Sequence, residues 1–197
     1  MKIWFIADSH FSHANIVRGC TTWPDTKNTR DFATVQEHDE YLLDQLNKRV
    51  KPSDVLYHLG DFGFGFAAKE GLPELRRKIA CRTVYLVKGN HDHVFDSNSK
   101  YREAYLPLFQ DVRDMYYKSI CGRKFVLCHF AMRTWPWQRH GSIHLYGHSH
   151  GNLPDDVNSY SLDVGVDTNL YGHDRYTPYE FDEIVHIMES HKKVNER

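Results

Sequence analysis

Five short runs of β-branched and aromatic residues, each too short to form a helix, constrain this chain more than any other feature. They cover residues 3–7, 55–59, 84–87, 125–128 and 143–146. Their nearly continuous hydrophobicity predicts strands that are covered on both faces. Segments with helical spacing separate them, so the sequence predicts an α/β fold. In such folds the functional site lies beyond the carboxyl ends of the strands.

The strongest helix signal covers residues 34–49, where Thr34 and Glu37 form a capping box. Weaker signals predict helices at 73–80 and 99–109. A further helix is predicted to start at a second capping box in 177–180, with Pro178 in its first position. The remaining predictions are a hairpin of 113–120 with 124–128, a surface loop at 152–161 and a solvated tail at 191–197.

Composition narrows the function classes. The chain has 25 basic and 26 acidic residues, so its formal net charge of −1 provides no strong nucleic-acid-binding surface. No apolar run approaches the ~18 residues that a membrane helix needs, and the first residues lack the pattern of a signal peptide. At about 150 residues per domain, we expect one domain over residues 1–197, cytoplasmic and without a membrane partner.

Each predicted strand is followed by residues that can bind a metal ion. The candidate ligands are Asp8, His10, Asp61, Asn90, His129, His148 and His150. One such residue at a strand end is usually a turn former or a structural side chain. Five strands that all end this way are difficult to explain as coincidence. Seven donors exceed the four of a tetrahedral zinc site and suit two ions about 3.5–4 Å apart that share a carboxylate.

The order of these motifs is D-x-H, G-D, G-N-H-D, H and G-H-x-H, over residues 8–150. This order resembles the calcineurin-like metallophosphoesterase superfamily, in particular its small single-domain phosphoesterases. Residues 163–167 resemble the strand that follows the last histidine motif of that superfamily. The resemblance implies a four-layer α/β/β/α sandwich, with two mixed β-sheets flanked by helices and a dinuclear site between the sheets.

The resemblance also implies a role for each residue of the site. The first metal ion would be held by Asp8, His10, Asp61 and His150, and the second by Asn90, His129 and His148 with Asp61 as the bridge. His91 would contact the phosphate and protonate the departing oxygen. The two divalent ions could be Mn, Zn, Fe or Ni, because imidazole-rich ligation admits all four. A water held between them would lose its proton near neutral pH and attack phosphorus as hydroxide.

The expected function is therefore metal-dependent hydrolysis of a small phosphodiester, such as a nucleotide or a cyclic nucleotide. A phosphomonoesterase is one alternative. Another is a non-catalytic binding or scaffold protein on the same fold, although a degenerate site should lack some ligands or His91. Residues 60–65 lack the second Asp and the Arg of protein Ser/Thr phosphatases, which argues against a phosphoprotein substrate. Residues 148–153 lack the H-x-H-x-D-H motif of the metallo-β-lactamase fold.

Other residues near these motifs are candidates for substrate contacts, namely His13, Arg18, Arg133 and Trp135, with Tyr171 and His173 as further candidates at the rim. Trp135 and Trp137 could stack on a base, but packing within their own loop is the favoured interpretation. Asp92 could orient His91 or its loop, or simply form a turn. His58, His144 and His186 lie inside predicted strands or helices and are interpreted as structural.

Overall fold

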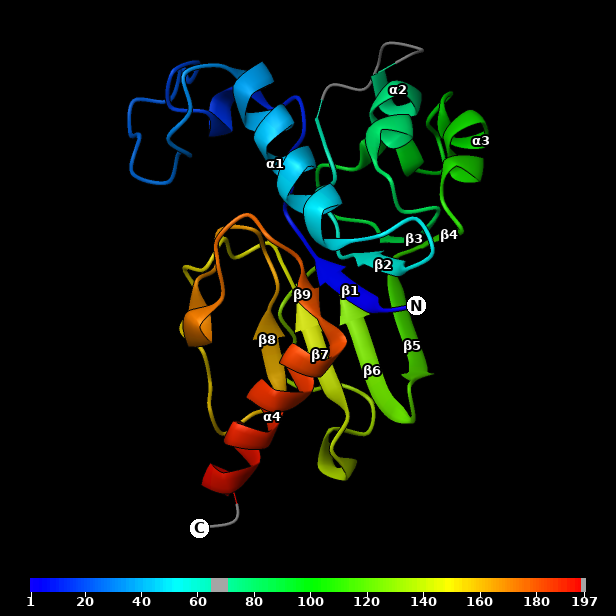
Figure 1. Cartoon of the computed structure of the whole chain (residues 1–197), viewed down its shortest axis with the longest axis vertical. Helices are drawn as coiled ribbons and strands as arrows, with labels where there is room; N and C mark the ends of the chain where they lie inside the picture. The colour runs from blue at the N-terminus through cyan, green and yellow to red at the C-terminus, as the bar shows by residue number, and fades with distance from the viewer. Residues whose placement is uncertain (65–70, 196–197) are drawn as a thin grey trace.

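Two mixed β-sheets face each other in the computed structural model, which describes residues 1–64 and 71–195, with side chains up to residue 191 (Figure 1). The first sheet contains, in spatial order, β4 (Asp111–Arg113), β3 (Thr83–Val87), β2 (Val55–His58), β1 (Ile3–Ile6) and β9 (Tyr179–Glu180). The second contains β5 (Met115–Ile120), β6 (Arg123–Cys128), β7 (Ile143–Tyr146) and β8 (Ser161–Asp163). The predicted α/β fold with two mixed sheets flanked by helices is confirmed.

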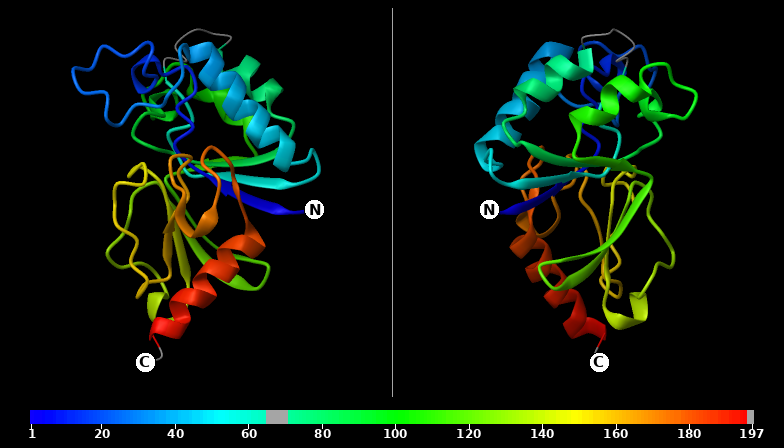
Figure 2. Two further views of the ribbon diagram at one scale, coloured as in Figure 1. Left: turned by 60° about the vertical axis from the view of Figure 1, so that its left-hand side comes forward. Right: turned by 90° about the vertical axis from the view of Figure 1, so that its right-hand side faces the viewer.

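The first sheet is parallel except for β9, which pairs antiparallel with β1. Three helices cover its outer face: α1 (Val35–Arg49), α2 (Gly71–Lys78) and α3 (Arg102–Tyr105), seen above the sheet in Figures 1 and 2. Because β1, β2 and β3 run in the same direction, the loops that follow them emerge at one edge of the sheet. Those loops carry the first three ligand motifs.

Helix α1 begins as its sequence predicts. The Thr34 side chain accepts a hydrogen bond from the Glu37 main-chain N–H at 3.1 Å. The Glu37 carboxylate accepts one from the main-chain N–H of Ala33 at 2.9 Å, one residue before the partner that a capping box normally uses. Leu42 and Leu46 then face the sheet and are fully buried. Capping and burial of one apolar face together fix this helix.

The second sheet is built on the predicted hairpin of β5 and β6, to which β7 and β8 are added in parallel. Its inner face packs on the first sheet, with the Phe5 and Phe125 rings stacked at 5.5 Å between centroids. Helix α4 (Phe181–Asn195) contributes Ile184 and Ile187 to this same core. The outer face is covered by residues 130–142, whose Trp135 ring lies 5.2 Å from that of His144.

Three local predictions are corrected. The segment 177–180 does not start a helix: Thr177 donates to the carbonyl of Asp174 at 2.6 Å, and Tyr179–Glu180 form strand β9. The predicted helix at 99–109 is divided between α3 and a 3-10 turn at Leu106–Leu108 that contains a proline.

The predicted tail from residue 191 is wrong at its start. His191 is 1% exposed within α4, and its Nδ1 donates to the carbonyl of Ser159 at 2.7 Å. This contact fixes the end of α4 against the loop predicted at 152–161, which has no helix or strand up to residue 160; Ser161 is instead the first residue of β8.

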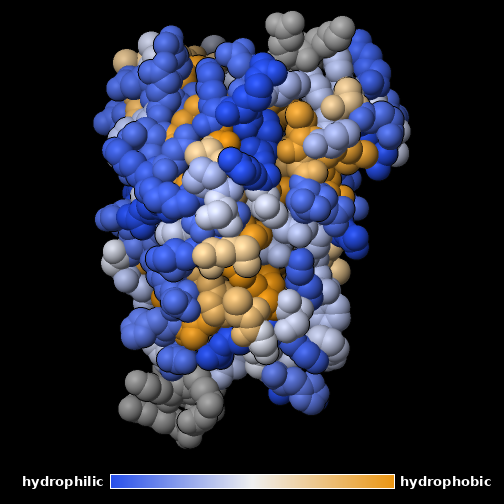
Figure 3. All heavy atoms as spheres, turned by 45° about the vertical axis from the view of Figure 1, so that its right-hand side comes forward, coloured by the Kyte–Doolittle hydropathy of each residue, from blue (hydrophilic) through white to orange (hydrophobic). Residues whose placement is uncertain are grey.

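Hydrophilic side chains predominate on the face drawn in Figure 3, and hydrophobic ones form separate patches between them. In the part of the chain that the structure describes, none of the helices has the length and apolar character needed to cross a bilayer.

Candidate metal centre

The seven candidate ligands meet where the loops after β1, β2, β3, β6 and β7 converge. Three overlapping groups, each with ligand atoms within 4.8 Å of one another, arise among these residues and His91. The groups are Asp8 with His10 and His150, His10 with Asp61 and His91, and Asp61 with His129 and His148. His10 and Asp61 each belong to two of the three groups, and together they link the cluster from Asp8 to His148.

The distances between donor atoms fit metal ligation. Oδ2 of Asp61 lies 3.3 Å from Nε2 of His129 and 3.5 Å from Nε2 of His10. Nε2 of His10 also lies 3.3 Å from Nε2 of His150. Two ligands of one tetrahedral ion with bonds of ~2.0–2.1 Å are separated by ~3.3–3.4 Å. The donor set, imidazoles with carboxylates and the Asn90 amide oxygen, is one that divalent transition metals accept.

The backbone is strained at five of the seven candidates. The φ angles are positive, between 49° and 67°, at Asp8, His10, Asp61, His148 and His150. Non-glycine residues rarely adopt this left-handed conformation, which costs of order 1–3 kcal/mol at each position and clusters at functional sites. Main-chain hydrogen bonds between neighbouring loops maintain it, from Asp8 N to Gly60 O at 3.0 Å and from His10 N to Asp61 O at 2.9 Å.

Glycine is required next to the central carboxylate. A Cβ atom on Gly89 would lie 2.2 Å from Oδ1 of Asp61, so the loop after β3 can approach Asp61 only without a side chain there. Gly60 has a φ of 93°, and a Cβ atom on it would lie 2.5 Å from Nδ1 of His129. This matches the close backbone approach that a glycine directly before Asp61 and before Asn90 predicts.

Acceptors behind the imidazoles fix their orientation. Nδ1 of His150 donates to Oδ2 of Asp167 at 2.7 Å, and Nδ1 of His129 donates to the carbonyl of Leu59 at 2.8 Å. Each of these bonds places the ring proton on Nδ1 and leaves the Nε2 lone pair directed into the cluster. Metal-binding histidines in proteins are held in this way.

A buried arginine that sequence analysis missed connects two of these loops. The guanidinium of Arg30, 1% exposed, pairs bidentately with Asp167 at 3.0 and 2.8 Å. It also donates to the main-chain carbonyls of Asp8 and Ser9. Arg30 lies in a polar loop without periodicity, so no local pattern marks it as buried. Its partner Asp167 stood in the motif 163–167 but had no assigned role.

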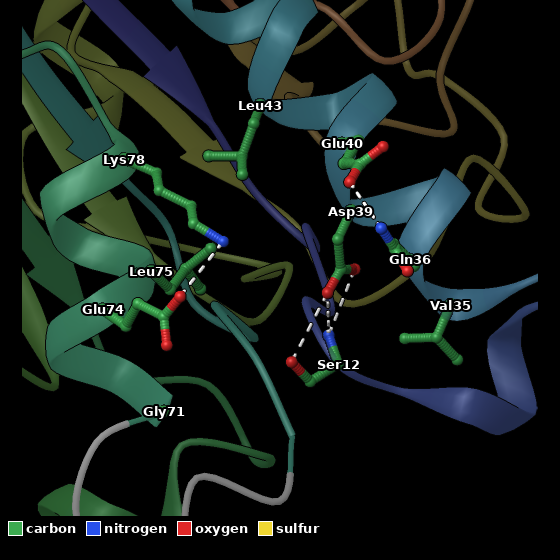
Figure 4. Close-up of a pocket in the computed structure, with 10 residues that line it drawn as sticks. All are labelled: Ser12, Val35, Gln36, Asp39, Glu40, Leu43, Gly71, Glu74, Leu75 and Lys78. Atoms are coloured by element: carbon green, nitrogen blue, oxygen red, sulfur yellow. Dashed lines mark hydrogen bonds and ion pairs between the residues drawn. The ribbon is translucent and has the colours of Figure 1, made fainter.

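Helix α1 supports the first ligand loop from the other side. Asp39 accepts hydrogen bonds from the main-chain N–H of Ser12 at 2.9 and 3.1 Å, as Figure 4 shows. These residues line a cavity of about 480 Å³ between α1 and α2. Among the described residues that line it, none is a candidate metal ligand. Asp39 therefore acts as a support for the loop that carries His10.

Asp92 holds two ligand loops together. Its buried carboxylate accepts hydrogen bonds from the main-chain N–H groups of Asp61 at 2.8 Å, Phe62 at 3.0 Å and Gly89 at 2.8 Å. Burial raises the pKa of Asp92 to about 6. Of the roles considered for Asp92, orientation of the loop fits these contacts, which reach the main chain rather than the ring of His91.

Burial and neighbouring charges shift the pKa values of the ligands in different directions. Burial raises the pKa of Asp8 to about 7. Burial also acts on Asp61, but the hydrogen bond and charge of His129 outweigh it and hold the pKa of that carboxyl below its usual range. Burial and the charge of Arg30 lower the pKa of His10 well below its ordinary value. Burial also acts on His129, but its hydrogen bond with Asp61 and the charge of that carboxylate outweigh it and raise the pKa of His129 to about 9. His10 is thus held neutral and Asp61 ionised, while His129 must give up a proton to bind a metal ion.

The candidate substrate contacts separate into two sets. His13 lies in the site: its Nδ1 is 3.3 Å from Nδ1 of His10. Arg18 instead pairs with Asp31 at 3.0 Å on the surface. Arg133 lines a separate cavity together with Trp135.

Trp135 is largely buried. It is 7% exposed, and its indole N–H donates to the carbonyl of Ser142 at 3.1 Å. Its burial favours packing within its own loop over the predicted substrate contact, because residues 130–142 use Trp135 to cover the second sheet. Trp137 contacts Tyr117, and Lys124 Nζ lies 3.0 Å from the Trp137 ring centroid.

The remaining side chains from the sequence analysis lie elsewhere. Tyr171 bonds with His191, and His173 stacks on Tyr179 at 3.5 Å, so the contacts of both side chains lie away from the ligand loops. His58 and His144 are buried and structural, as predicted, whereas His186 is exposed on α4.

Comparison with known proteins agrees with this geometry. A family model described as calcineurin-like phosphoesterase matches residues 1–175. An uncharacterised protein of Methanocaldococcus jannaschii is 29% identical over 196 residues, which cover 98% of this chain and 94% of that protein. A protein of unknown function from Aquifex aeolicus has a similar structure, with a TM-score of 0.64 and 24% identity over 94% of this chain and 98% of that one. A structure described as a novel archaeal phosphodiesterase has a TM-score of 0.46 and 17% identity, over 92% and 99% of the two chains.

Proposed function

Since the chain belongs to the calcineurin-like phosphoesterase family, we propose that it hydrolyses small phosphodiesters with the help of two divalent metal ions. One observation carries the proposal: Oδ2 of Asp61 lies within 3.5 Å of Nε2 of both His10 and His129, which come from loops far apart in the sequence. A carboxylate shared in this way is the expected bridge of a two-metal site. The complete set of seven donors with His91 argues against the alternative of a degenerate binding protein.

The proposed assignment of ligands places one set of four donors on each side of Asp61, as the resemblance to the family implies. Asp8, His10, Asp61 and His150 hold one ion, and Asp61, Asn90, His129 and His148 hold the other. When bound, the ions supply Lewis acidity, which lowers the pKa of water toward ~7 and stabilises charge on the phosphoryl oxygens. Two carboxylates offset only part of the charge of two divalent ions, so the centre attracts an anionic substrate. Mn, Zn, Fe and Ni all suit these ligands.

His91 is the proposed acid for the departing oxygen. Its main-chain N–H donates to Oδ1 of Asp61 at 2.8 Å, and its Nε2 lies 4.0 Å from Oδ2 of the same carboxylate. The side chain is 32% exposed, in contrast to the buried His10 and His129. An imidazole at the open side of the centre can hold a proton at Nε2 and transfer it to the leaving group. Asn90 and His148 are exposed on the same centre, which leaves room for substituents on the phosphorus.

The test is metal-dependent hydrolysis by the purified chain. After removal of metal with a chelator, the protein is reloaded separately with Mn, Zn, Fe or Ni. It is then assayed on bis-p-nitrophenyl phosphate, p-nitrophenyl phosphate and a panel of cyclic nucleotides. We expect diester hydrolysis with at least one metal, and loss of both activity and bound metal in Asp61→Asn. The exposed Asp182→Asn variant is the matched control.

Three results would contradict the proposal. Hydrolysis of the monoester alone would replace the phosphodiesterase with the phosphomonoesterase alternative. A protein that binds two ions but hydrolyses neither ester would favour the non-catalytic alternative. Wild-type turnover in Asp61→Asn would exclude the ligand assignment itself.

A further inference from the structure

Three aromatic rings from two loops form a wall beside His91. The aromatic wall consists of His13, Trp23 and Phe64. The His13 ring stacks on Phe64 at 4.5 Å and 22°, and the Trp23 ring meets His13 edge-on at 6.0 Å. Trp23 is 42% exposed and Phe64 is 41% exposed, although both are large apolar side chains. The wall therefore presents two open aromatic surfaces and one ring, His13, that connects them to the metal centre.

The wall is attached to the candidate centre. The Phe64 ring lies 5.6 Å from the ring of His91, and His13 lies at the same 5.6 Å from His91 and 5.2 Å from His10. The main-chain N–H of Phe64 donates to the carbonyl of Phe11 at 2.8 Å. Phe11 is next to the ligand His10, so the position of Phe64 is tied to the loop that supplies one of the proposed ligands.

Exposure of two such rings at one place requires an explanation. A cluster of exposed apolar side chains next to a polar site is typical of a binding surface. Aromatic rings stack on planar ligands, and each base stacked in this way contributes ~1–3 kcal/mol of binding free energy. The Phe64 and His13 rings of the wall each lie 5.6 Å from the His91 ring. A pentose can bridge this separation between a base and its phosphate.

We propose that the aromatic wall binds the base of a nucleotide unit, so that the substrates are phosphodiesters of nucleosides. This inference rests on the proposed function, since it places the phosphate at the metal centre. It differs from the stacking first considered for Trp135, which is buried on the other sheet. Phe64 and Trp23 supply the stacking surface, and His91 lies between that surface and the phosphate.

The experiment compares two ligands that differ only in the base. Binding of AMP and of ribose 5-phosphate to manganese-loaded protein is measured by calorimetry and by tryptophan fluorescence. We expect AMP to bind about tenfold more tightly, within the range that stacking of one base provides. The preference for AMP should disappear in Phe64→Ala, remain reduced in Phe64→Leu and return in Phe64→Trp. The fluorescence change on AMP binding should be lost in Trp23→Phe.

Controls separate this inference from the proposed function. Tyr117→Ala removes another exposed aromatic ring, on β5, and should keep the full preference for AMP. Thermal unfolding and metal content of each variant identify any that fail to fold. Equal affinity of the wild type for AMP and ribose 5-phosphate, or an unchanged preference in both Phe64→Ala and Phe64→Leu, would overturn the inference. Hydrolysis of bis-p-nitrophenyl phosphate, measured in parallel, tests the proposed function whatever the binding result.

Discussion

His150 donates a hydrogen bond from Nδ1 to Oδ2 of Asp167 at 2.7 Å, while the buried guanidinium of Arg30 pairs with the same carboxylate at 2.8 Å. The Asp167 carboxylate thus connects the candidate ligand His150 to Arg30 in the loop after β1. Burial opposes ionisation of Asp167, but Arg30 and His150 hold the pKa of the carboxyl far below its usual range. Asp167 therefore remains ionised and keeps the His150 ring in one orientation.

Asp167→Asn should weaken metal binding and also lower the free energy of unfolding, because it leaves the buried Arg30 without an ionised partner. The amide is uncharged, so it orients His150 less strongly, and loss of such a contact typically lowers metal affinity 10–100-fold. Titration of the metal-free protein with Zn or Mn measures the effect, and Asp182→Asn, an exposed change on α4, is the control. Unchanged affinity in Asp167→Asn would show that this carboxylate does not support a ligand.

Arg30→Met should be strongly destabilising. The substitution leaves Asp167 as an unpaired buried charge and removes the donors for the carbonyls of Asp8 and Ser9. Breaking a buried pair from one side costs about 3–5 kcal/mol of the free energy of unfolding. Urea unfolding at neutral pH measures it. Arg18→Met removes an exposed pair with Asp31 and should cost less than about 1 kcal/mol; similar losses for both variants would contradict the buried role of Arg30.

His91→Ala should lower kcat by about 10²–10⁴-fold while the metal content is retained, if His91 acts as the proposed acid. The loss should be larger for a diester with an alkoxide leaving group than for one that releases p-nitrophenolate, because the latter needs no proton. Metal analysis of the same samples gives the second readout. Loss of one bound ion in His91→Ala would instead assign His91 as a ligand, an arrangement that its group with His10 and Asp61 would allow.

Asp54 should make stability depend on pH in acid. Its carboxylate, 4% exposed, accepts hydrogen bonds from the main-chain N–H groups of Lys2 at 2.7 Å and Lys51 at 3.0 Å and from the Trp4 indole at 3.1 Å. Burial opposes ionisation, but these donors lower the pKa of Asp54 below its usual value. The stabilisation is therefore fully present above the unfolded pKa of about 4 and is lost as the pH falls through the folded value.

Asp54→Asn accordingly should cost about 2 kcal/mol at pH 7, since hydrogen bonds to a charged group contribute about 1.5–3 kcal/mol. The difference from wild type should shrink below pH 4, where Asp54 becomes protonated first in the unfolded chain and then, below its lowered folded pKa, in the native protein. Urea unfolding at pH 7, 5 and 3 measures this. A difference that stays constant with pH would contradict the depressed pKa, and Asp182→Asn should show no effect beyond about 0.5 kcal/mol.

The sequence by itself predicted five strands, the hairpin and the identity of the clustered donors, whereas the two sheets were implied by the resemblance to the family. Apolar runs such as 55–59 are local signals, and a donor such as Asp61 directly after a parallel strand must emerge at the shared edge of the sheet. The α1 cap at Thr34 is also local and was predicted correctly. The single domain, the cytoplasmic location and the metal identity remain predictions.

Only the tertiary structure decided which other side chains serve the site. Arg30 and Asp167 are 137 residues apart, so neither segment alone reveals their pair. The Thr177 segment carried a cap signal, yet pairing with β1 drew Tyr179–Glu180 into a strand. Trp135 is buried while Trp23 and Phe64 are exposed, although each lies in a loop. Burial depends on what packs across from a residue after folding, and that partner comes from a distant part of the chain.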